Sequence, residues 1–562
     1  MPALDGHVIT DDEGGDDAAA SALVLGPMLR YVDDTSATIW VETSRPGEVT
    51  VLGHRARTFC VRRRHYALVI VEGLAPASRT EYDVRFNGEV VWPAAGSDLP
   101  PSVIRTTGGD GVDLLIGSCR TAAPHEPPYT LELAVDERGR GIDTLWAHAG
   151  RMAAEPVEAW PTLLLLLGDQ IYADDSSPRT EERIEQTRGE GCDLPSSIVL
   201  GFEEYCWLYE EAWSPGLERW LFSVLPSIMI FDDHDVIDDW NISAAWKAEI
   251  SEEPWWHDHD IGSLMSYWIY QHLGNMPPER IHTEGLLARL ASVDDGSEVL
   301  EAWAQALLDN PGPYHFSYAR DLGEVKIVVI DCRHGRILAE QHRRMVDEDE
   351  WSWIRRQALD HHGAHLLLAT TLPVFVEPGL HDLQAWNERV CGGAWGRWLT
   401  GWAEKVRRAF DLEHWSAFAT SYEEFVALVT DLQSAEDPPP TTVVASGDIH
   451  FSYSARVDIG GPGARVHQVV SSPIRNALIP PERGVIRFML SGAGRRAGAI
   501  LRRLTGRRPS AVAIETDAGP FFANNMATIR YRGQDVELAL EQGTPADGGR
   551  RGELTEVARI RL

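Results

Sequence analysis

The pattern of hydrophobic positions divides the chain into two regions of different character. Residues 22–108 hold short apolar stretches separated by turn residues. Residues 37–43 and 48–52 alternate between apolar and polar positions, and residues 66–71 form a continuous apolar run. Alternation with a period of two is typical of half-buried strands. We therefore expect a small all-β sandwich over residues 22–108, followed by a short linker rich in proline and glycine.

Six further apolar runs of strand length follow the linker, with long helical or irregular stretches between them. Runs this apolar are typical of strands that are covered on both faces of a sheet, as in α/β proteins. The pattern predicts an α/β domain over residues 109–540 and a C-terminal segment over residues 541–562. The six runs are residues 112–116, 162–167, 227–231, 325–330, 365–369 and 441–445.

The residues that follow these runs point to a shared site. In layered α/β folds, ligands bind at the carboxyl ends of the strands. One aspartate in such a position is a common turn or helix-capping residue, but five chemically similar endings are hard to assign to capping alone. The five endings are Gly117-Ser-Cys119, Gly168-Asp169, Asp232-Asp-His-Asp235, Asp331-Cys-Arg333 and Gly447-Asp-Ile-His450.

The net charge of the chain argues against some classes of binding partner. The chain of 562 residues has 51 Lys and Arg against 85 Asp and Glu, a formal net charge of −34. A surface this acidic repels phosphate backbones, so general nucleic-acid binding is not expected. The charge suits a protein that holds cations, or it serves only to solvate the surface.

The termini and cysteines indicate a cytoplasmic protein. Residues 1–21 are acidic and unpatterned, which predicts a disordered tail without an export signal or a twin arginine. No apolar run is long enough to span a bilayer, so we expect no transmembrane segment. The six cysteines are far apart in sequence and follow no zinc-finger spacing, so reduced thiols are expected.

Several strand endings carry side chains that suit hard cations. Asp169 is followed three residues later by Tyr172, so a carboxylate and a phenolate can approach one point, and a phenolate favours Fe³⁺. Residues 232–235 place three carboxylates around one imidazole, which is costly without a cation nearby. Asp448 and His450 point the same way in extended backbone. Each motif has a structural alternative: a capping aspartate, a solvated acidic loop or a buried inert cysteine at Cys119.

Other catalytic signatures are missing from the sequence. No GxSxG elbow follows a strand, which argues against a serine hydrolase. No P-loop or dinucleotide-binding glycine pattern is present, which argues against the use of nucleoside triphosphates or dinucleotides.

In order and spacing, the five endings resemble the motifs of the PhoD-like alkaline phosphatase/phosphodiesterase family, in the metallophosphoesterase superfamily. The family motifs match Gly117–Cys119, Gly168–Tyr172, Asp232–Asp235, Asp331–Arg333 and Ser446–His450. The resemblance implies a four-layer α/β/β/α sandwich behind a fibronectin III- or Ig-like domain. In such a domain Tyr82 would bond back to its own chain and lock the sandwich.

The same resemblance implies roles for individual residues. Asp169 would bridge two metal ions, most readily Fe³⁺ with Ca²⁺, and Mn²⁺, Mg²⁺ or Zn²⁺ are further candidates. His234 would protonate the leaving group with Asp235 orienting it, and Arg333 would contact the phosphate or support the metal ligands. The implied metal ligands are Cys119, Asp169, Tyr172, Asp232, Asp233, Asp448 and His450.

The implied activity is hydrolysis of small or polymeric phosphate esters, as a phosphomonoesterase, a phosphodiesterase or both. Metal ions would lower the pKa of a bridging water, and the resulting hydroxide would attack phosphorus in line. Two alternatives stay open: a metallohydrolase of another ester class, and a non-catalytic binding protein with a vestigial metal site.

A basic segment stands out from the acidic chain. Residues 494–508 hold three pairs of adjacent arginines in a pattern that predicts an amphipathic helix. Such a helix could attract a polyanionic substrate or a membrane surface. Alternatively, it pairs with neighbouring acidic side chains.

Overall fold

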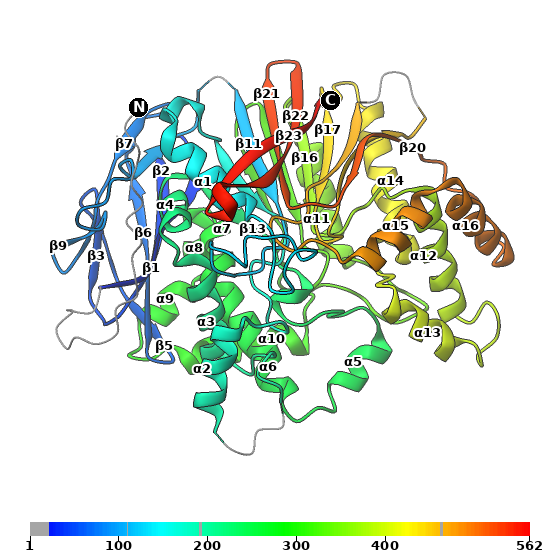
Figure 1. Ribbon diagram of the computed structural model, residues 1–562, viewed down its shortest axis with the longest axis horizontal. Helices are drawn as coiled ribbons and strands as arrows, with labels where there is room; N and C mark the ends of the chain where they lie inside the picture. Colours follow the sequence, from blue (N-terminus) through cyan, green and yellow to red (C-terminus); the bar gives the residue numbers. More distant parts are fainter. Residues whose placement is uncertain (1–21, 110, 190–193, 461–464) are drawn as a thin grey trace.

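The structure is a computed structural model that describes residues 22–109, 111–189, 194–460 and 465–562. The expected acidic tail at 1–21 lies outside the described residues. The chain forms several sheets and many helices (Figure 1). A mixed α/β fold is therefore confirmed.

Two four-stranded sheets form the N-terminal part, in the orders β1-β2-β6-β5 and β4-β3-β8-β9, with a separate pair, β10-β7. Inward-facing residues such as Ile39, Val49 and Val69 are fully buried, which explains the alternating pattern of the sequence. The strands are β1 (Leu23–Val32), β2 (Ser36–Thr43), β3 (Glu48–Val51), β4 (His54–Arg57), β5 (Phe59–Val61), β6 (Arg64–Glu72), β7 (Arg79–Glu81), β8 (Val84–Phe86), β9 (Glu89–Trp92) and β10 (Val103–Arg105).

A six-stranded sheet, in the order β13-β12-β11-β21-β22-β23, follows the linker. Strands β11, β12 and β13 are parallel, and the C-terminal strands join them antiparallel. The expected boundary at residue 540 falls inside β22, so the last residues continue this sheet. The strands are β11 (Val112–Gly117), β12 (Leu163–Leu166), β13 (Ser227–Met229), β21 (Asn525–Arg532), β22 (Asp535–Ala546) and β23 (Arg551–Arg561).

A seven-stranded sheet has the order β14-β15-β16-β17-β19-β18-β20, with β15, β16, β17 and β19 parallel. All six apolar runs that the sequence predicted as strands lie in these two large sheets. The strands are β14 (Tyr318–Asp321), β15 (Val325–Ile330), β16 (His365–Thr370), β17 (Thr442–Ser446), β18 (Ser452–Asp458), β19 (Val466–Val470) and β20 (Ala513–Phe521).

Alternate residues of the large sheets divide between separate cores. Ile116 of β11 and Ile327 of β15 belong to one apolar cluster shared by both sheets. Leu115 packs on the opposite side of its sheet among helical residues, and Val328 does the same in the other sheet. Strands buried on both faces explain the continuous apolar runs.

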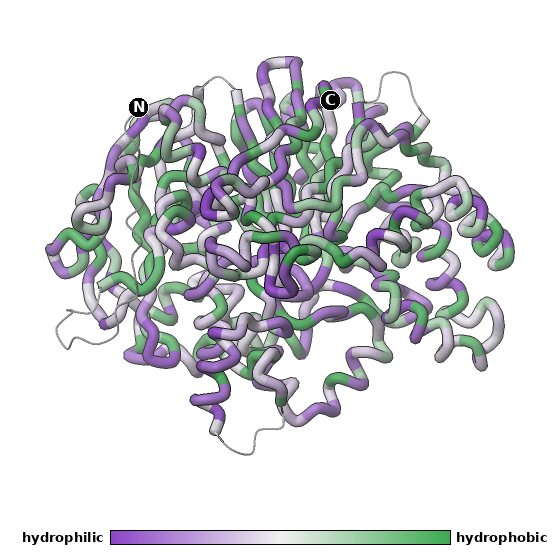
Figure 2. The backbone as a smooth tube through the Cα atoms, viewed as in Figure 1, coloured by the Kyte–Doolittle hydropathy of each residue, from purple (hydrophilic) through white to green (hydrophobic). Residues whose placement is uncertain are grey.

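The connections between strands are mostly helical. Along peripheral helices such as α16, Figure 2 shows hydrophobic and hydrophilic stretches alternating. The α-helices are α1 (Thr144–Ala154), α2 (Pro178–Arg188), α3 (Phe202–Trp213), α4 (Gly216–Val224), α5 (Ala244–Ile250), α6 (Trp256–Tyr267), α7 (Leu273–Asn275), α8 (Pro278–Glu284), α9 (Leu286–Ala291), α10 (Ser297–Asp309), α11 (Glu348–Leu359), α12 (Pro378–Cys391), α13 (Thr400–Ala409), α14 (Ala419–Ser434), α15 (Pro480–Leu490) and α16 (Gly492–Leu504). Short 3₁₀ turns are η1 (Val157–Ala159), η2 (Asp233–Asp235), η4 (Trp415–Ala417) and η5 (Asp547–Gly549), and η3 (Trp268–His272) is a π-helical turn.

The N-terminal sheets are bonded to the rest of the molecule through buried side chains. The Tyr82 hydroxyl donates to the Ser223 carbonyl in α4 at 2.6 Å, so its backbone acceptor is not in its own sheets as expected; it also bonds the Ser102 side chain of the N-terminal part. The buried Arg30 guanidinium donates to the carbonyls of Tyr270 and Gln271 at 2.9 and 2.7 Å. Tyr82 therefore joins the two parts of the chain and does not form the expected corner.

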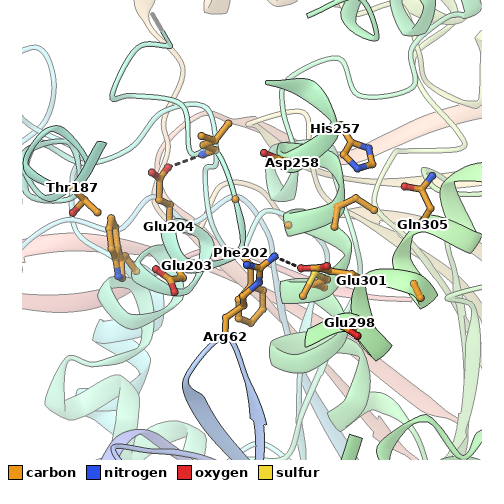
Figure 3. Close-up of a pocket in the computed structure, with 17 residues that line it drawn as sticks. Arg62, Thr187, Phe202, Glu203, Glu204, His257, Asp258, Glu298, Glu301 and Gln305 are labelled. Carbon is orange, nitrogen blue, oxygen red and sulfur yellow. Dashed lines mark hydrogen bonds and ion pairs between the residues drawn. The ribbon is translucent and has the colours of Figure 1, made fainter. Parts of the chain in front are cut away.

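A cavity of about 620 Å³ opens between α3, α6 and α10, beside Arg62 of the N-terminal sandwich (Figure 3). Its lining includes none of the expected metal ligands. Among the described residues no helix is both long and apolar enough to cross a membrane. None of the five cysteines in the described part of the chain forms a disulfide.

Candidate metal centre

The carboxyl ends of strands from both large sheets meet at one group of side chains. Cys119 follows β11, Asp169 follows β12, Asp233 begins the 3₁₀ turn after β13, and Asp448 and His450 follow β17. Residues separated by more than 300 positions are thereby brought together, because parallel strands place their carboxyl ends at the same edge.

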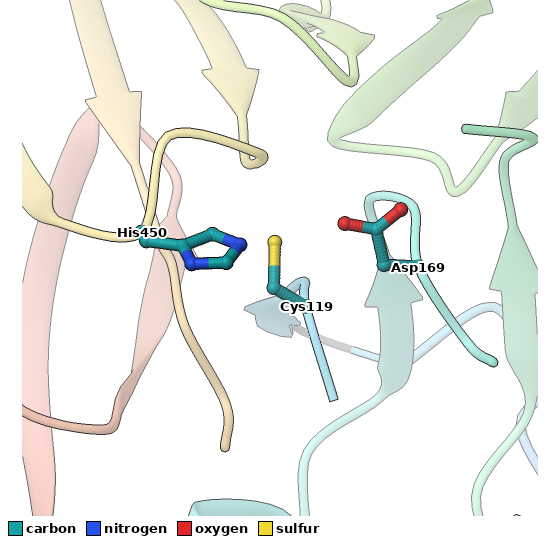
Figure 4. A group of neighbouring side chains, drawn as sticks. All are labelled: Cys119, Asp169 and His450. Atoms are coloured by element: carbon teal, nitrogen blue, oxygen red, sulfur yellow. The ribbon is translucent and has the colours of Figure 1, made fainter. Parts of the chain in front are cut away.

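The first group consists of Cys119, Asp169 and His450, whose ligand atoms lie within 4.8 Å of one another. Figure 4 shows the three side chains reaching one region from three separate segments. Burial, together with the nearby charge of Asp169, raises the pKa of the Cys119 thiol. Burial and the charge of His234 lower the pKa of His450 to about 3, so its imidazole is neutral, the form that binds metal ions.

The second group consists of Asp169, Asp232, Asp233 and Asp448, with ligand oxygens again within 4.8 Å of one another. Asp169 belongs to both groups. It is fully buried, and neither of its carboxylate oxygens has a hydrogen-bond partner among the described residues. Burial and the charge of Asp232 raise the pKa of Asp169 well above its ordinary value. An unpartnered buried carboxylate among other carboxylates fits hard cations.

Four of these residues have unusual backbone angles. Cys119, Asp169, Asp448 and His450 have φ values of 57°, 51°, 66° and 54°, in the left-handed region that residues other than glycine seldom adopt. Strain of this kind persists only where the surrounding structure enforces it, and it clusters at functional sites. The turns after β11, β12 and β17 therefore hold the side chains in place at a cost in backbone energy.

Tyr172 lies beside the first group. The charges of Cys119 and Asp169, after burial, are the main causes that raise the pKa of its phenol. Its ring centroid is 4.5 Å from that of His234. The structure therefore brings Tyr172 together with the other expected ligands.

His234 is held by a residue that the sequence motifs did not single out. Its Nδ1 lies 2.9 Å from Oδ1 of Asp174, and Oδ2 of Asp174 accepts a hydrogen bond from the Asp238 backbone at 2.7 Å. Although burial would lower it, the charge of Asp174 raises the pKa of His234. Asp235, the expected partner, instead accepts hydrogen bonds from the Asp232 backbone and the Gln271 side chain.

Arg333 is fully buried among carboxylates and does not face solvent. Its Nε donates to Asp232 at 2.5 Å, and its Nη2 lies 3.0 Å from both Asp233 and Asp448. Its Nη1 donates to Glu413 at 2.6 Å. Since every nitrogen has an acidic partner, Arg333 offsets part of the negative charge of the second group. The arrangement does not support the expected direct contact with a phosphate.

A solved structure titled "Structure of PhoD" aligns with 98% of this chain and 91% of that chain, with a TM-score of 0.60 and 10% sequence identity. The fold is PhoD-like.

Other comparisons add less. A family model described as a domain of unknown function (DUF7800) matches residues 20–104. No curated protein matches the chain in sequence. A maltogenic amylase from S. marinus covers 94% of this chain and 80% of its own at 9% identity, but its TM-score of 0.15 carries no argument.

Two residues of this candidate site were missed by reading the sequence. Asp174 stands two positions after Tyr172, so extending the Gly168–Tyr172 motif by two residues would have included it. Glu413 lies 80 positions from Arg333, in a tryptophan-rich insertion that carries no motif. Only the tertiary structure places Glu413 at the site.

Proposed function

We propose that this protein is a metal-dependent phosphoesterase of the PhoD-like alkaline phosphatase/phosphodiesterase type. The proposal includes the four-layer α/β/β/α arrangement of the metallophosphoesterase superfamily for residues 109–540, behind a fibronectin III-like domain at 22–108. The observation that carries it is Asp169, a buried carboxylate that belongs to both ligand groups and has no hydrogen-bond partner among the residues that the structure describes. A carboxylate shared between two groups is suited to bridging two cations.

The two groups differ in chemistry and therefore in the metal that each would prefer. Cys119, Tyr172 and His450 offer sulfur, phenol oxygen and nitrogen beside Asp169, a set that suits Fe³⁺. The remaining aspartates, Asp232, Asp233 and Asp448, offer only oxygen and suit Ca²⁺, with Mn²⁺, Mg²⁺ or Zn²⁺ as further candidates. Bound cations would supply Lewis acidity toward phosphate oxygens and lower the pKa of a nearby water.

The chain itself would supply the proton for the leaving group. The His234 side chain is about one-fifth exposed, whereas the neighbouring aspartates are almost fully buried. Asp174 stabilises the imidazolium form, so His234 can donate a proton to the alkoxide that leaves phosphorus. The substrate is a small or polymeric phosphate ester, as a monoester or a diester.

The first test is elemental analysis of the purified protein together with assays on p-nitrophenyl phosphate and bis-p-nitrophenyl phosphate. We expect bound iron with calcium, and hydrolysis of at least one of the two esters. Asp169→Ala should lose both the metal ions and turnover. Protein without metal and without turnover would contradict the proposal and favour a binding protein, and hydrolysis of carboxylate esters alone would favour another metallohydrolase.

A second variant separates proton donation from metal binding. His234→Ala should keep its metal content and lose turnover of esters with poor leaving groups, while activated p-nitrophenyl esters, which need no protonation, are affected less. Equal losses on both kinds of ester would remove the proposed acid role.

A further inference from the structure

The helix α16 lies at one end of the molecule and contacts α12 and α15 (Figure 1). Ile500 and Leu504 lie one turn apart on its outer face, with 56% and 60% of their surface exposed. On its inner face Gly498 packs closely on α12: a Cβ atom there would lie 2.7 Å from the Gly379 carbonyl. Helix α16 therefore packs on α12 through its small residue Gly498, and its large apolar residues Ile500 and Leu504 face outward.

In each of the three arginine pairs at 495–508, one arginine faces the protein and the other faces outward. The first arginine of each pair faces an acidic residue of α12 or the turn before it: Arg495 to Glu377 at 3.8 Å, Arg502 to Asp382 at 2.9 Å and Arg507 to Glu388 at 3.0 Å. The second of each pair is exposed: Arg496, Arg503 and Arg508. In the part of the chain that the structure describes, no carboxylate lies within 4.0 Å of these three. Pairing with neighbouring acids thus accounts for only half of the basic segment.

Exposed aromatic side chains lie next to this surface. Trp398 and Trp402 have 82% and 48% of their surface exposed. Their segment contacts α16, because the Trp395 indole donates to the Leu504 carbonyl at 3.3 Å. Tryptophan is enriched where protein meets the headgroup region of a bilayer. We call Arg496, Ile500, Arg503, Leu504, Trp398 and Trp402 the α16 patch.

The neighbouring helix α15 connects this end of the molecule to the metal centre. Ile486 and Leu490 of α15 pack on the same small cluster as Ile449, which stands between Asp448 and His450. None of the residues of α15 is fully buried, and Phe488 is 52% exposed. Helix α16 thus contacts a helix that packs on the same cluster as the residue between two expected ligands.

We propose that the α16 patch binds the surface of an anionic lipid bilayer. The unpaired arginines complement anionic headgroups, although the protein as a whole carries a net charge of −34. The exposed Ile500 and Leu504 between those arginines match an interfacial amphipathic helix. A nucleic acid would need the positive charge but not the exposed aliphatic residues. This inference goes beyond the proposed esterase activity and does not depend on it.

The test is co-sedimentation of the full chain with vesicles of phosphatidylcholine, with and without phosphatidylglycerol. We expect binding only to the anionic vesicles, weakening as salt is raised. Arg496→Gln/Arg503→Gln should weaken it about 25-fold, since each arginine at such a surface contributes roughly a fivefold factor. Ile500→Ser/Leu504→Ser should weaken it about tenfold through the lost burial of apolar surface.

The matched control is Arg57→Gln/Val90→Ser, an exposed arginine and a half-exposed valine on the N-terminal sandwich. It should bind as the parent protein does. All variants should keep the parent melting temperature, which separates lost docking from lost folding. Equal binding to both kinds of vesicle, unchanged binding by the α16 variants, retention of DNA in place of vesicles, or self-association through Ile500 and Leu504 would each overturn the proposal.

Discussion

Asp174 and His234 show how far one side chain determines the chemistry of this site. Asp174 accepts from a backbone amide with one oxygen and contacts Nδ1 of His234 with the other. The ring is therefore fixed in orientation through Nδ1, while its Nε2 lies 3.9 Å from Oδ1 of Asp238, too far for a hydrogen bond. A carboxylate held in this way also favours the protonated ring, which a general acid requires.

At this scale we predict that Asp174→Asn lowers kcat about 10²-fold on esters with poor leaving groups, the usual size of a general-acid contribution. The metal content should not change, because Asp174 is outside both ligand groups. Steady-state kinetics across a series of leaving groups would check this. Asp235→Asn is the control variant, and the dependence of its kcat on the leaving group should be that of the parent protein. If kcat of Asp235→Asn depends more steeply on the leaving group, Asp235 and not Asp174 orients His234.

At the scale of elements, the turn after β15 joins the turns after β13 and β17 through one guanidinium. Arg333 is bonded to Asp232, Asp233 and Asp448, and Glu413 fixes its remaining end. Separate segments are thereby held in register around a negative cluster. Removing the positive partner of such a buried group is strongly destabilising, because carboxylates are left without compensation.

We predict that Arg333→Met lowers the free energy of unfolding by about 3–5 kcal/mol when a chelator is present. Added divalent cations should restore most of this loss, because they can neutralise the same carboxylates. The control is Arg407→Met, which removes an equally buried arginine paired with Glu340 and Glu404, away from the metal centre. Urea unfolding with and without cations measures both, and equal rescue of the two variants would count against the metal site.

The helix α1 carries a second electrostatic feature, the buried His148. Burial and the charges of Arg151 and Arg530 lower its pKa to about 3, while Glu541 acts in the opposite direction. An unfolded histidine has a pKa near 6.5, so below that pH the unfolded chain takes up a proton that the folded chain does not. His148 therefore stabilises the fold less and less as the pH falls from 6.5 toward 3.

We predict that the parent protein loses about 2 kcal/mol of stability through His148 between about pH 7 and pH 5. In His148→Gln this part of the pH dependence should disappear. Urea unfolding at several pH values would measure the difference. His282→Gln, at an exposed position in α8, should keep the parent slope; an unchanged slope in His148→Gln would show that His148 is not its source.

At the scale of the whole molecule, the N-terminal sandwich and the α/β part share buried contacts. Tyr82 donates to Ser223, and Arg30 reaches the turn at Tyr270 and Gln271. Apolar residues of both parts also belong to one continuous cluster. Such contacts favour unfolding of the two parts as one unit.

We predict that Tyr82→Phe lowers the free energy of unfolding of the entire chain by about 1–2 kcal/mol, the usual effect of a lost buried hydrogen bond. Calorimetry should show a single transition shifted to lower temperature. Separate transitions, of which only one moves, would show instead that the sandwich unfolds independently.

The strands could be predicted from the sequence because residues of a strand buried on both faces are apolar, which gives continuous apolar runs. All six long apolar runs are strands of the two large sheets, and the residues after five of them meet at one site. Hydrogen bonds and ion pairs between side chains that are far apart in the chain produce no recognisable sequence pattern. For that reason Glu413 was missed, Asp235 was expected to orient His234, and the backbone acceptor of Tyr82 was expected within its own sheets.

The sequence by itself determined the α/β class, six strands of the two large sheets and the types of side chain at their ends, since each follows from local hydrophobic periodicity and turn chemistry. Only the tertiary structure decided that Asp169 belongs to two ligand groups, that Arg333 is a buried counter-ion, and that half of the arginines in residues 495–508 remain unpaired. These depend on distances between segments far apart in the chain, which hydrophobic packing of the two sheets sets and no local pattern encodes.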